Sequence, residues 1–248
     1  MRIGIIGAGQ VGANLAYSFV RIGHTVKIAN SRGPETLSEI ASLTGATAVP
    51  LAEAVKDADL VVLSIPFKRI PDLPKGLFAG VPAATPVIDT NNYYPEVRDG
   101  KIEAVEAGMV ESAWVAAQIG HPVIKVFNNI GERLATVGVP PGTPGRIALP
   151  VAGDDAKAKA LVMGLVDAIG FDPVDAGTIA ESWRQQPGCP GYGKDNDRAS
   201  WIRDLAATDR AALPGARKAM TELILAYQAQ KAAEASPLAW LKARGPAR

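Results

Sequence analysis

Short apolar runs separated by helix-like stretches dominate the first part of the chain. The first apolar run, 2–6, is followed by a helical pattern that ends near Ile22, and a second apolar run occupies 25–29. Short apolar runs are typical of buried strands, whereas apolar spacings of three and four are typical of helices. The pattern therefore predicts a strand–helix–strand unit at the start of the chain.

The same alternation continues beyond this unit. Further strands are predicted at 46–49, 60–64, 86–89, 123–127, 146–152 and 171–175, and helices at 33–44, 51–56, 112–119 and 156–169. Strands that alternate with helices form parallel sheets covered on both faces. We expect an α/β fold with a doubly wound, mostly parallel sheet of the Rossmann type. It is expected to form one domain, residues 1–177, in which 171–175 is the closing edge strand.

From residue 178 the pattern becomes helical, which predicts a small helical C-terminal extension, 178–248. Its main helix is expected at 212–233, where a stripe of apolar side chains indicates one packed face. This stripe consists of Leu213, Ala216, Met220, Leu223, Ile224 and Tyr227. The face could cover the sheet domain or a second copy of the chain, so a homodimer through the C-terminal helices is one expectation. The tail, 236–248, is expected to be a short helix with a frayed end.

The turn after the first strand, 7–12, reads Gly-Ala-Gly-Gln-Val-Gly. Between a strand and a helix, Gly-x-Gly-x-x-Gly is the fingerprint of dinucleotide binding. The first glycine permits the tight turn, the second lets the backbone approach a pyrophosphate, and the third lets the helix pack against the sheet. The start of the helix then favours phosphate through its N–H groups and its dipole. The alternative is a glycine-rich turn that binds nothing. The cofactor-binding residues expected here are Gly7, Gly9, Gln10, Val11 and Gly12.

The end of the second strand indicates which dinucleotide binds. NAD-binding units usually have an Asp or Glu there for the ribose 2′-hydroxyl, but this chain has Asn30, Ser31 and Arg32. A carboxylate would repel a 2′-phosphate, whereas a hydroxyl and a guanidinium can bind it with charge-assisted hydrogen bonds. The alternative for Arg32 is a solvated loop arginine. We expect NADP rather than NAD.

Polar and apolar residues follow the later strands at the edge where the cofactor is expected. Ser64, Ile65, Pro66 and Phe67 come after the strand 60–64, where they could line the nicotinamide or form an ordinary exit with Pro66 as strand breaker. The loop 90–95 is rich in hydrogen-bonding side chains. It could line the substrate cleft or form a self-capped turn.

Two asparagines at these strand ends complete the predicted site. Asn91 lies in the loop 90–95, and Asn128 follows the strand 123–127, so both reach the same edge of the sheet. Asp89 could be a helix cap or a buried strand-end carboxylate. Asp154 and Asp155 are explained by capping of the helix 156–169.

Composition excludes several classes of protein. The 248 residues carry a formal net charge of +1, so no general attraction to nucleic acid or anionic membranes is expected. No apolar run is long enough to span a membrane, and the glycine turn begins too early for a signal peptide. One cysteine, Cys189, excludes an internal disulfide and fits a reducing cytoplasm. With His24 and His121 as the only histidines, no histidine-rich metal site is expected.

The sequence offers no evident catalytic acid or base. No Ser-His-Asp set and no pair of carboxylates for acid–base work can be identified, both histidines lie at the wrong edge of the sheet, and Cys189 has no neighbour that would lower its pKa. The catalytic residues are therefore unknown at this level. Hydride transfer between two redox rings needs stacking, orientation and exclusion of water rather than a protein acid. This favours a flavin-like acceptor over a carbonyl substrate.

As a set, these motifs resemble the NADP oxidoreductases that depend on coenzyme F-420, a deazaflavin, and the Rossmann domain is also similar to that of STEAP-type reductases. The resemblance covers about residues 1–180 and rests on the segments 6–12, 30–32, 64–67, 127–130, 149–155 and 175–177. It implies that Ser31 and Arg32 hold the 2′-phosphate and that 65–67 lie along the nicotinamide. It also implies direct hydride exchange between NADPH and a deazaflavin ring stacked upon it.

Three hypotheses follow. The first is an NADP(H)-dependent oxidoreductase that transfers hydride between NADPH and a small redox acceptor, a flavin or deazaflavin acting as co-substrate. The second is an NADPH-dependent reductase of a small carbonyl or imine, with Lys125, Asp89 or Tyr93 as proton donor. The third is a non-enzymatic, NADP-binding regulatory module whose helical tail recruits a partner.

Overall fold

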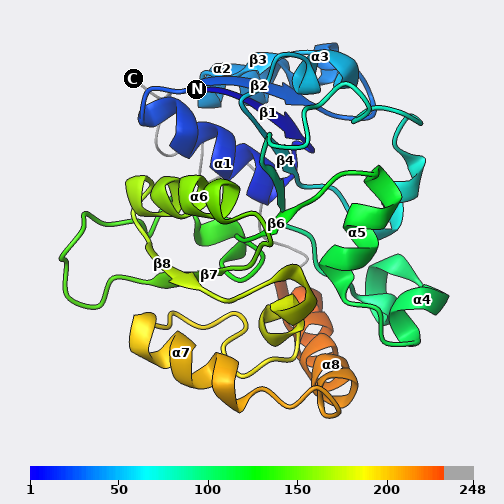
Figure 1. The fold of residues 1–248 in the computed structure, drawn as a ribbon, viewed down its shortest axis with the longest axis vertical. Helices are drawn as coiled ribbons and strands as arrows, with labels where there is room; N and C mark the ends of the chain where they lie inside the picture. The colour runs from blue at the N-terminus through cyan, green and yellow to red at the C-terminus, as the bar shows by residue number, and fades with distance from the viewer. Residues whose placement is uncertain (232–248) are drawn as a thin grey trace.

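Six parallel strands form the main sheet (Figure 1). The computed structural model describes residues 1–231, and the strand order is β3-β2-β1-β4-β5-β6. The strands are β1 Arg2–Ile6, β2 Thr25–Ala29, β3 Thr47–Ala48, β4 Leu60–Leu63, β5 Val87–Asp89 and β6 Ile124–Lys125. This is the order of dinucleotide-binding sheets, in which ligands bind beyond the carboxyl ends where the order reverses, here between β1 and β4. The predicted α/β fold with a doubly wound parallel sheet is confirmed.

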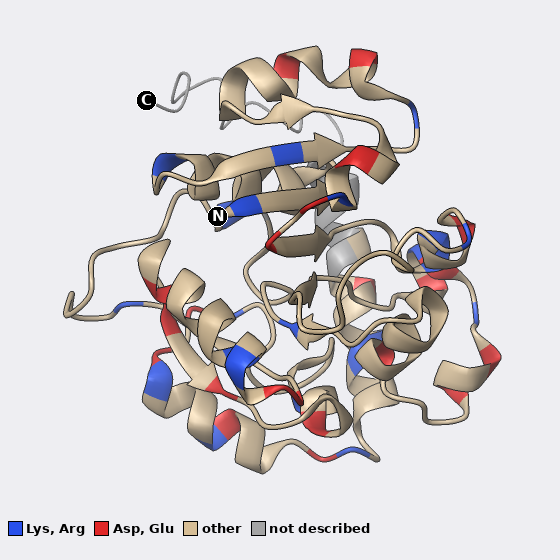
Figure 2. Cartoon of the chain, turned by 45° about the horizontal axis from the view of Figure 1, so that its top comes forward, with Lys and Arg blue, Asp and Glu red and all other residues tan. Residues whose placement is uncertain are grey.

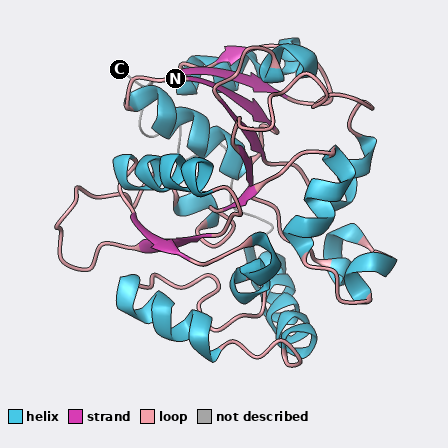
Figure 3. Cartoon of the chain, in the orientation of Figure 1, coloured by secondary structure: helices cyan, strands magenta, loops and turns pink. Residues whose placement is uncertain are grey.

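Helices cover both faces of this sheet (Figure 3). One core cluster contains side chains of α1 (Gln10–Arg21), α2 (Ser38–Thr44) and α6 (Ala156–Ala168). The other contains side chains of α3 (Leu51–Val55), α4 (Glu103–Glu106) and α5 (Glu111–Ile119). In β4, Leu60 and Val62 belong to the first cluster and Val61 and Leu63 to the second, because side chains alternate along a strand. Burial on both faces explains why the strands appear in the sequence as continuous apolar runs.

Short helical segments connect these elements. The predicted helix 33–44 is divided into a 3-10 segment, η1, and α2, which ends at Gly45 in the left-handed conformation, with a φ of +76°. The other short segments are η2 Phe67–Asp72, η3 Pro95–Asp99, η4 Gly131–Arg133 and η5 Ile179–Gln185, and η1 spans Pro34–Leu37.

The last two strands form a separate parallel pair, β7 (Ala148–Val151) and β8 (Asp172–Asp175). The expectation that 171–175 closes the main sheet is therefore wrong, because β8 pairs with β7 alone among the described strands. A single antiparallel bridge, Lys125 to Ala152, joins this pair to β6. Phe127 explains the short β6, since its φ of +65° takes the chain out of the extended region just after Lys125.

The C-terminal region packs on the β7–β8 pair (Figure 1). Its helices are α7 (Arg198–Ala207) and α8 (Leu213–Lys231). A third apolar cluster joins Trp201, which is fully buried, and Leu205 to Ala148 and Val174 of the pair. This cluster crosses residue 177, so the two predicted domains share a core, and the boundary between them stays a prediction.

The apolar stripe predicted on α8 does not pack as expected. Leu213 is buried, but Leu223 is 72% exposed, and the position that turns inward is Thr221, which is 1% exposed. Leu213 and Thr221 are eight residues apart, so they lie on one face of the helix with Arg217 between them. Arg217 reaches the ring of Tyr93 and thereby makes the inner face partly polar. The side chains of Ile224 and Tyr227 and the predicted tail helix lie outside the described residues.

Charged residues of both signs are interspersed over the chain (Figure 2). This distribution agrees with the small formal net charge of +1. None of the helices between residues 1 and 231 combines the length and the apolar character that a membrane span requires.

Candidate cofactor and active site

The glycine turn joins β1 to α1 at the carboxyl edge of the sheet. Gly7 has a φ of +110°, and a Cβ there would lie 1.9 Å from the carbonyl oxygen of Ser64. A Cβ on Gly12 would lie 1.9 Å from the carbonyl oxygen of Gly7, whereas a Cβ on Gly9 would have no described atom within 4 Å. The first and third positions therefore need glycine for close backbone contact. Gly9 leaves open space in front of the helix.

The start of α1 is suited to an anion. Among the described residues, no side chain caps Gly9 and no acidic residue lies in the first turn. The positive end of the helix dipole is thus left without a protein carboxylate. Gln10 and Val11, which were predicted to bind the cofactor, form this turn together with Gly12.

A cavity of about 480 Å³ opens beside the glycine turn. It collects residues from the carboxyl ends of β1, β2 and β4, as a dinucleotide crevice should. Its wall is formed by Ile6, Gly7, Ala8, Gly9, Asn30, Ser31, Arg32, Leu51, Ser64, Ile65, Pro66, Arg69, Asp72 and Leu73. The structure thus brings together the predicted residues of the three strand ends, apart from those in α1 and Phe67.

Asn30 shapes the loop that brings Ser31 and Arg32 to the cavity. Its Oδ1 accepts a hydrogen bond of 2.9 Å from the backbone N–H of Arg32, and its Nδ2 donates one of 2.8 Å to Oγ1 of Thr36. The first of these is the local turn that asparagine forms with its own backbone two residues on. Ser31 and Arg32 are consequently held at the tip, with exposed side chains that face the cavity.

Two charged residues in the cavity wall were missed by the sequence analysis. Arg69 and Asp72 belong to η2, and the Arg69 Nη1 lies 2.9 Å from the Asp72 Oδ2. The signal in the sequence is the basic pair Lys68-Arg69 directly after the β4 exit, but only the 3-10 turn shows which of the two faces the cavity. Arg69 adds a second cation to the wall that contains Arg32.

Phe67 does not line the cavity, contrary to the prediction. Its side chain is fully buried and stacks on Trp114, with ring centroids 4.6 Å apart and planes 19° apart. The ring of Tyr93 packs against it at 5.4 Å. The reason is that η2 begins at Phe67 and turns this side chain inward. Phe67 supports the wall that Ile65 and Pro66 form.

A buried charged cluster lies below the ends of β5 and β6. Lys125 and Asp89 face each other in register and are both fully buried, with the Lys125 Nζ 3.5 Å from the Asp89 Oδ2. Oγ of Ser112 donates a hydrogen bond of 2.7 Å to the same Asp89 oxygen. Lys125 Nζ also donates to the backbone carbonyl of Asn91, and Asp89 Oδ1 accepts the backbone N–H of Asn91 at 2.9 Å. Asp89 is thus a buried strand-end carboxylate.

Asn128 is occupied by other parts of the protein. Its Nδ2 donates to Asn92 Oδ1 at 3.0 Å and to the carbonyl oxygen of Gln185 at 2.8 Å. Its Oδ1 accepts hydrogen bonds from Asn129 and from Gln185. These bonds use the full capacity of a primary amide. The predicted contact of Asn128 with the cofactor would have to displace one of these bonds. In this structure, the Asn128 side chain joins η5 to the sheet.

A tyrosine pair and a buried glutamate lie at the same edge. The hydroxyl groups of Tyr94 and Tyr192 are 2.6 Å apart, and Asn92 Nδ2 donates to the Tyr192 oxygen at 2.8 Å. Glu111 is 1% exposed, and burial raises its pKa to about 7 although Lys125 and Arg217 oppose the shift. Neither Glu111 nor Tyr192 was predicted. Glu111 appeared in the sequence as an ordinary first-turn acid of a helix, and Tyr192 lies in a Gly/Pro loop far along the chain.

Tyr93, one of the proton donors considered for a carbonyl reductase, is a poor acid in this structure. Burial raises the pKa of Tyr93 to about 12. A hydrogen bond from the Ile102 N–H opposes this rise but is the smaller effect. Its hydroxyl donates to Glu106 Oε1 at 3.0 Å and accepts the Ile102 N–H at 2.8 Å.

The histidines and the cysteine lie in structural positions. His24 contacts the chain start and Phe19, and His121 lies 3.1 Å from the carbonyl oxygen of Pro82, so both are on the amino side of the sheet. Cys189 is buried, and burial raises the pKa of its thiol to about 12. A thiolate is the reactive form of cysteine, so this residue is unsuited to nucleophilic work.

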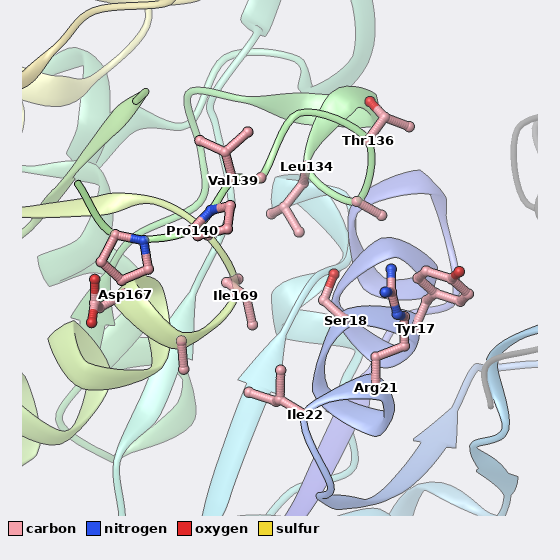
Figure 4. A pocket seen from close by; sticks show the side chains of 15 residues that line it. Tyr17, Ser18, Arg21, Ile22, Leu134, Thr136, Val139, Pro140, Asp167 and Ile169 are labelled. Atoms are coloured by element: carbon pink, nitrogen blue, oxygen red, sulfur yellow. The ribbon is translucent and has the colours of Figure 1, made fainter. Parts of the chain in front are cut away.

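A second cavity, of about 330 Å³, lies at the end of α1 that is remote from the glycine turn (Figure 4). It is enclosed by the last turn of α1, the end of α6 and the segment 134–141. Arg21 lies over the ring of Tyr17, 5.6 Å from its centroid, and Asp167 is paired with Arg146 at 2.6 Å. This cavity is separate from the strand ends where the candidate site lies.

Comparison with known proteins identifies the family. Residues 2–93 match the family described as NADP oxidoreductase, coenzyme F420-dependent. A hypothetical protein of Sinorhizobium meliloti with a known crystal structure is 31% identical. The similarity covers 79% of this chain and 95% of that protein, with a TM-score of 0.66. The chain belongs to this NADP oxidoreductase family. The resemblance to the NADP oxidoreductases that depend on coenzyme F-420 is confirmed.

Two further proteins extend the comparison. A protein of Arthrobacter sp. FB24, with the proposed description of an F420-dependent NADP reductase, is 21% identical. The match covers 73% of this chain and 87% of that protein, with a TM-score of 0.58, which shows that the two proteins share a fold. YjhV of Escherichia coli strain K12 is 51% identical over 65 residues, and the match spans 26% of this chain and 47% of that protein. The chain thus matches about half the length of this relative. Family and fold are those of NADP-dependent oxidoreductases.

Proposed function

We propose that the protein is an NADP(H)-dependent oxidoreductase that transfers hydride between NADPH and a flavin-like or deazaflavin acceptor. The observation that supports this proposal best is the cavity at the glycine turn, because Ser31 and Arg32 line it where an NAD-binding domain usually has a carboxylate. Among the described residues of that wall, Asp72 is the one carboxylate, and Arg69 is paired with it. The family of NADP oxidoreductases supports the same assignment.

The residues of the cavity have separate tasks in this proposal. The backbone at Gly9 and the first turn of α1 bind the pyrophosphate, and Ser31 and Arg32 bind the 2′-phosphate. Ile65 and Pro66 provide an apolar wall along the nicotinamide and help to exclude water. A bound NADPH supplies the hydride. The protein therefore contributes orientation and a dry environment.

The internal partners of the candidate proton donors support an acceptor that is a flavin-like ring. The carbonyl-reductase hypothesis names three proton donors, and each has partners within the protein. Lys125 donates to Asn91 and pairs with Asp89, while Tyr93 is bonded to Glu106. Hydride transfer to a flavin-like ring does not require any of them to give up a proton.

An acceptor screen tests the proposal. NADPH oxidation would be followed by absorbance with FMN, FAD, riboflavin, coenzyme F-420 and a water-soluble quinone. We expect turnover with at least one flavin-like ring and a preference for NADPH over NADH. Protein that binds NADPH tightly but reduces none of these acceptors would contradict the proposed acceptor class.

Glu111 favours a second candidate, reduction of a small carbonyl or imine. Its pKa of about 7 would let it exchange a proton near neutral pH, and the Tyr94–Tyr192 pair lies at the same edge. A panel of ketones and cyclic imines tests this candidate. Turnover whose pH profile changes in Glu111→Gln would favour it over the flavin-like acceptor.

The C-terminal region gives little support to a regulatory module with a recruiting tail. Its described part packs on its own sheet, through the third apolar cluster and through the bonds of Gln185 and Tyr192 to the strand-end asparagines. We propose instead that α8 forms a homodimer interface. Leu223 and Leu225 are 72% and 46% exposed on this helix, and contact with a second copy would remove this apolar surface from water.

A further inference from the structure

A buried ion pair holds both backbone polar groups of one residue, Asn91, at the carboxyl edge of the sheet. Lys125 on β6 and Asp89 on β5 are register partners, and neither side chain reaches solvent. The Asp89 carboxylate accepts the backbone N–H of Asn91, and the Lys125 ammonium donates to the backbone carbonyl of the same residue. Ser112 adds a third bond, to the other oxygen of the carboxylate.

This arrangement has a cost that apolar packing would avoid. Taking a carboxylate and an ammonium out of water is unfavourable, and well-packed apolar residues in their place are often as stable or more so. What a buried pair can supply in return is a fixed position for the groups that it binds. Here the positioned group is Asn91, since both of its backbone polar groups end on the pair.

The side chain of Asn91 has an unused donor. Asn91 is 5% exposed, and its Nδ2 is buried without a hydrogen-bond partner among the described residues. The neighbouring Asn92 and Asn128 use their amide groups on one another. A buried donor without a partner is costly, and a ligand that supplies the acceptor would remove this cost.

The location of Asn91 indicates which ligand this is. The preceding residue, Thr90, donates both its N–H and its Oγ1–H to the carbonyl oxygen of Leu63, each at 3.2 Å. Leu63 is followed directly by Ser64 and Ile65, which line the cofactor cavity. Because β4 lies between β1 and β5 in the sheet, Asn91 follows the strand end next to Ser64 and Ile65. This is the side on which a dinucleotide bound across the crevice would place its nicotinamide half.

We propose that Asn91 Nδ2 donates a hydrogen bond to the carboxamide oxygen of the nicotinamide ring, and that Lys125 and Asp89 are positioning residues that hold Asn91 for this contact. The inference rests on the proposed function, because it requires an NADP-binding crevice. It assigns to Lys125 a role other than proton donor.

Two ligands separate this role from a general effect on folding. Adenosine 2′,5′-bisphosphate carries the adenosine and 2′-phosphate of NADPH but no nicotinamide. Asn91→Ala should weaken NADPH binding roughly three- to tenfold, the effect of one hydrogen bond, and leave the affinity for the bisphosphate unchanged. Isothermal titration calorimetry measures both affinities.

Lys125→Met should have the same selective effect. Because Lys125 acts through Asn91, the double variant Asn91→Ala/Lys125→Met should lose no more NADPH affinity than Asn91→Ala alone. Lys101→Met, at an exposed lysine, is the matched control and should bind both ligands like the wild type. If Lys125→Met does not fold, Lys125→Met/Asp89→Asn removes both charges and should show the selective loss.

The outcomes distinguish the inference from the function on which it rests. Wild-type protein that binds neither ligand would overturn the proposed function and the inference with it. Wild-type protein that binds both, together with an Asn91→Ala variant that binds NADPH normally or loses both ligands equally, would overturn the inference alone. If the losses of NADPH affinity add up in the double variant, Lys125 does not act through Asn91.

Discussion

Arg32 and Glu111 show how differently a charge behaves at the two ends of the candidate site. Arg32 is exposed at the tip of a loop and meets its expected partner only when a ligand is bound. Glu111 is enclosed by Tyr93, Lys125 and Arg217, so its protonation state depends on the folded structure itself. Measurements of coenzyme affinity therefore test Arg32, and measurements of the free energy of unfolding test Glu111.

Arg32→Glu should weaken NADPH binding without harming the fold. The substitution removes charge-assisted hydrogen bonds to the 2′-phosphate and adds repulsion, which together cost about 2–3 kcal/mol, or roughly 30- to 150-fold in affinity. NADH lacks the phosphate, so its affinity should stay the same or rise. Calorimetry with both coenzymes measures the ratio, and Lys157→Glu, at an exposed position on α6, is the charge-matched control. An unchanged NADPH affinity would show that Arg32 does not bind the 2′-phosphate.

Glu111→Gln should change how stability depends on pH. The folded protein holds a proton on Glu111 up to about pH 7, whereas the unfolded chain releases it near the ordinary value of 4.5. The folded state thus binds more protons between these values, and the free energy of unfolding falls as pH rises through them. Between pH 5 and pH 8 the wild type should lose roughly 2–3 kcal/mol relative to Glu111→Gln.

Urea denaturation at a series of pH values checks this expectation. The difference between the two proteins should be largest below pH 5 in favour of the wild type and should decline toward pH 8. Parallel curves for the two proteins would show that Glu111 titrates normally in the folded state.

At the level of elements, hydrogen-bonded side chains hold the C-terminal region to the sheet. Asn128 binds Asn92 and Gln185 at once, so it connects the end of β6 with the loop after β5 and with η5. Tyr192 makes a second connection, to Asn92 and Tyr94. These contacts cross the predicted boundary at residue 177 without the large apolar area of the main core.

Asn128→Ala should therefore loosen η5 before it affects the Rossmann sheet. The substitution leaves buried partners of Asn128 unsatisfied, at about 1–3 kcal/mol for each group that water cannot reach. Hydrogen exchange should rise across 179–193 and stay low in β1 and β4. Asn196→Ala, which removes a side-chain bond to Asp204, is the control and should leave 179–193 protected. A uniform rise over the whole chain would contradict this connecting role.

The sequence predicted those features of the fold and of the site that depend on the spacing of neighbouring residues. The glycine turn, the short strands and Ser31-Arg32 follow each other within about thirty residues, so their chemistry could be inferred from order alone. Arg69 and Glu111 could not be found in this way, because their roles depend on a 3-10 turn and on side chains from distant elements. The α8 stripe misled for a related reason. Periodicity shows that a helix has a face but not that Arg217 and Thr221 would form part of the inward one.

For the whole molecule, the exposed side of α8 predicts self-association. Leu223→Glu places a charge on the proposed dimer face, where burial of an unpaired carboxylate is costly. Light scattering coupled to size exclusion should give a dimer for the wild type and a monomer for Leu223→Glu. Glu222→Gln, which alters an exposed neighbour without adding charge to the face, should remain dimeric. A wild type that is monomeric at high concentration would contradict the interface.

The cavity at the glycine turn is built entirely from the first 73 residues. Everything that tells NADP from NAD in this proposal thus sits in those first 73 residues, together with Ile65 and Pro66 beside the nicotinamide, while Asn91 and Glu111 come from later in the chain. Coenzyme preference can consequently be engineered by exchanging only the loop 30–32 with that of a relative, which leaves the wall at the nicotinamide and the later groups of the site as they are.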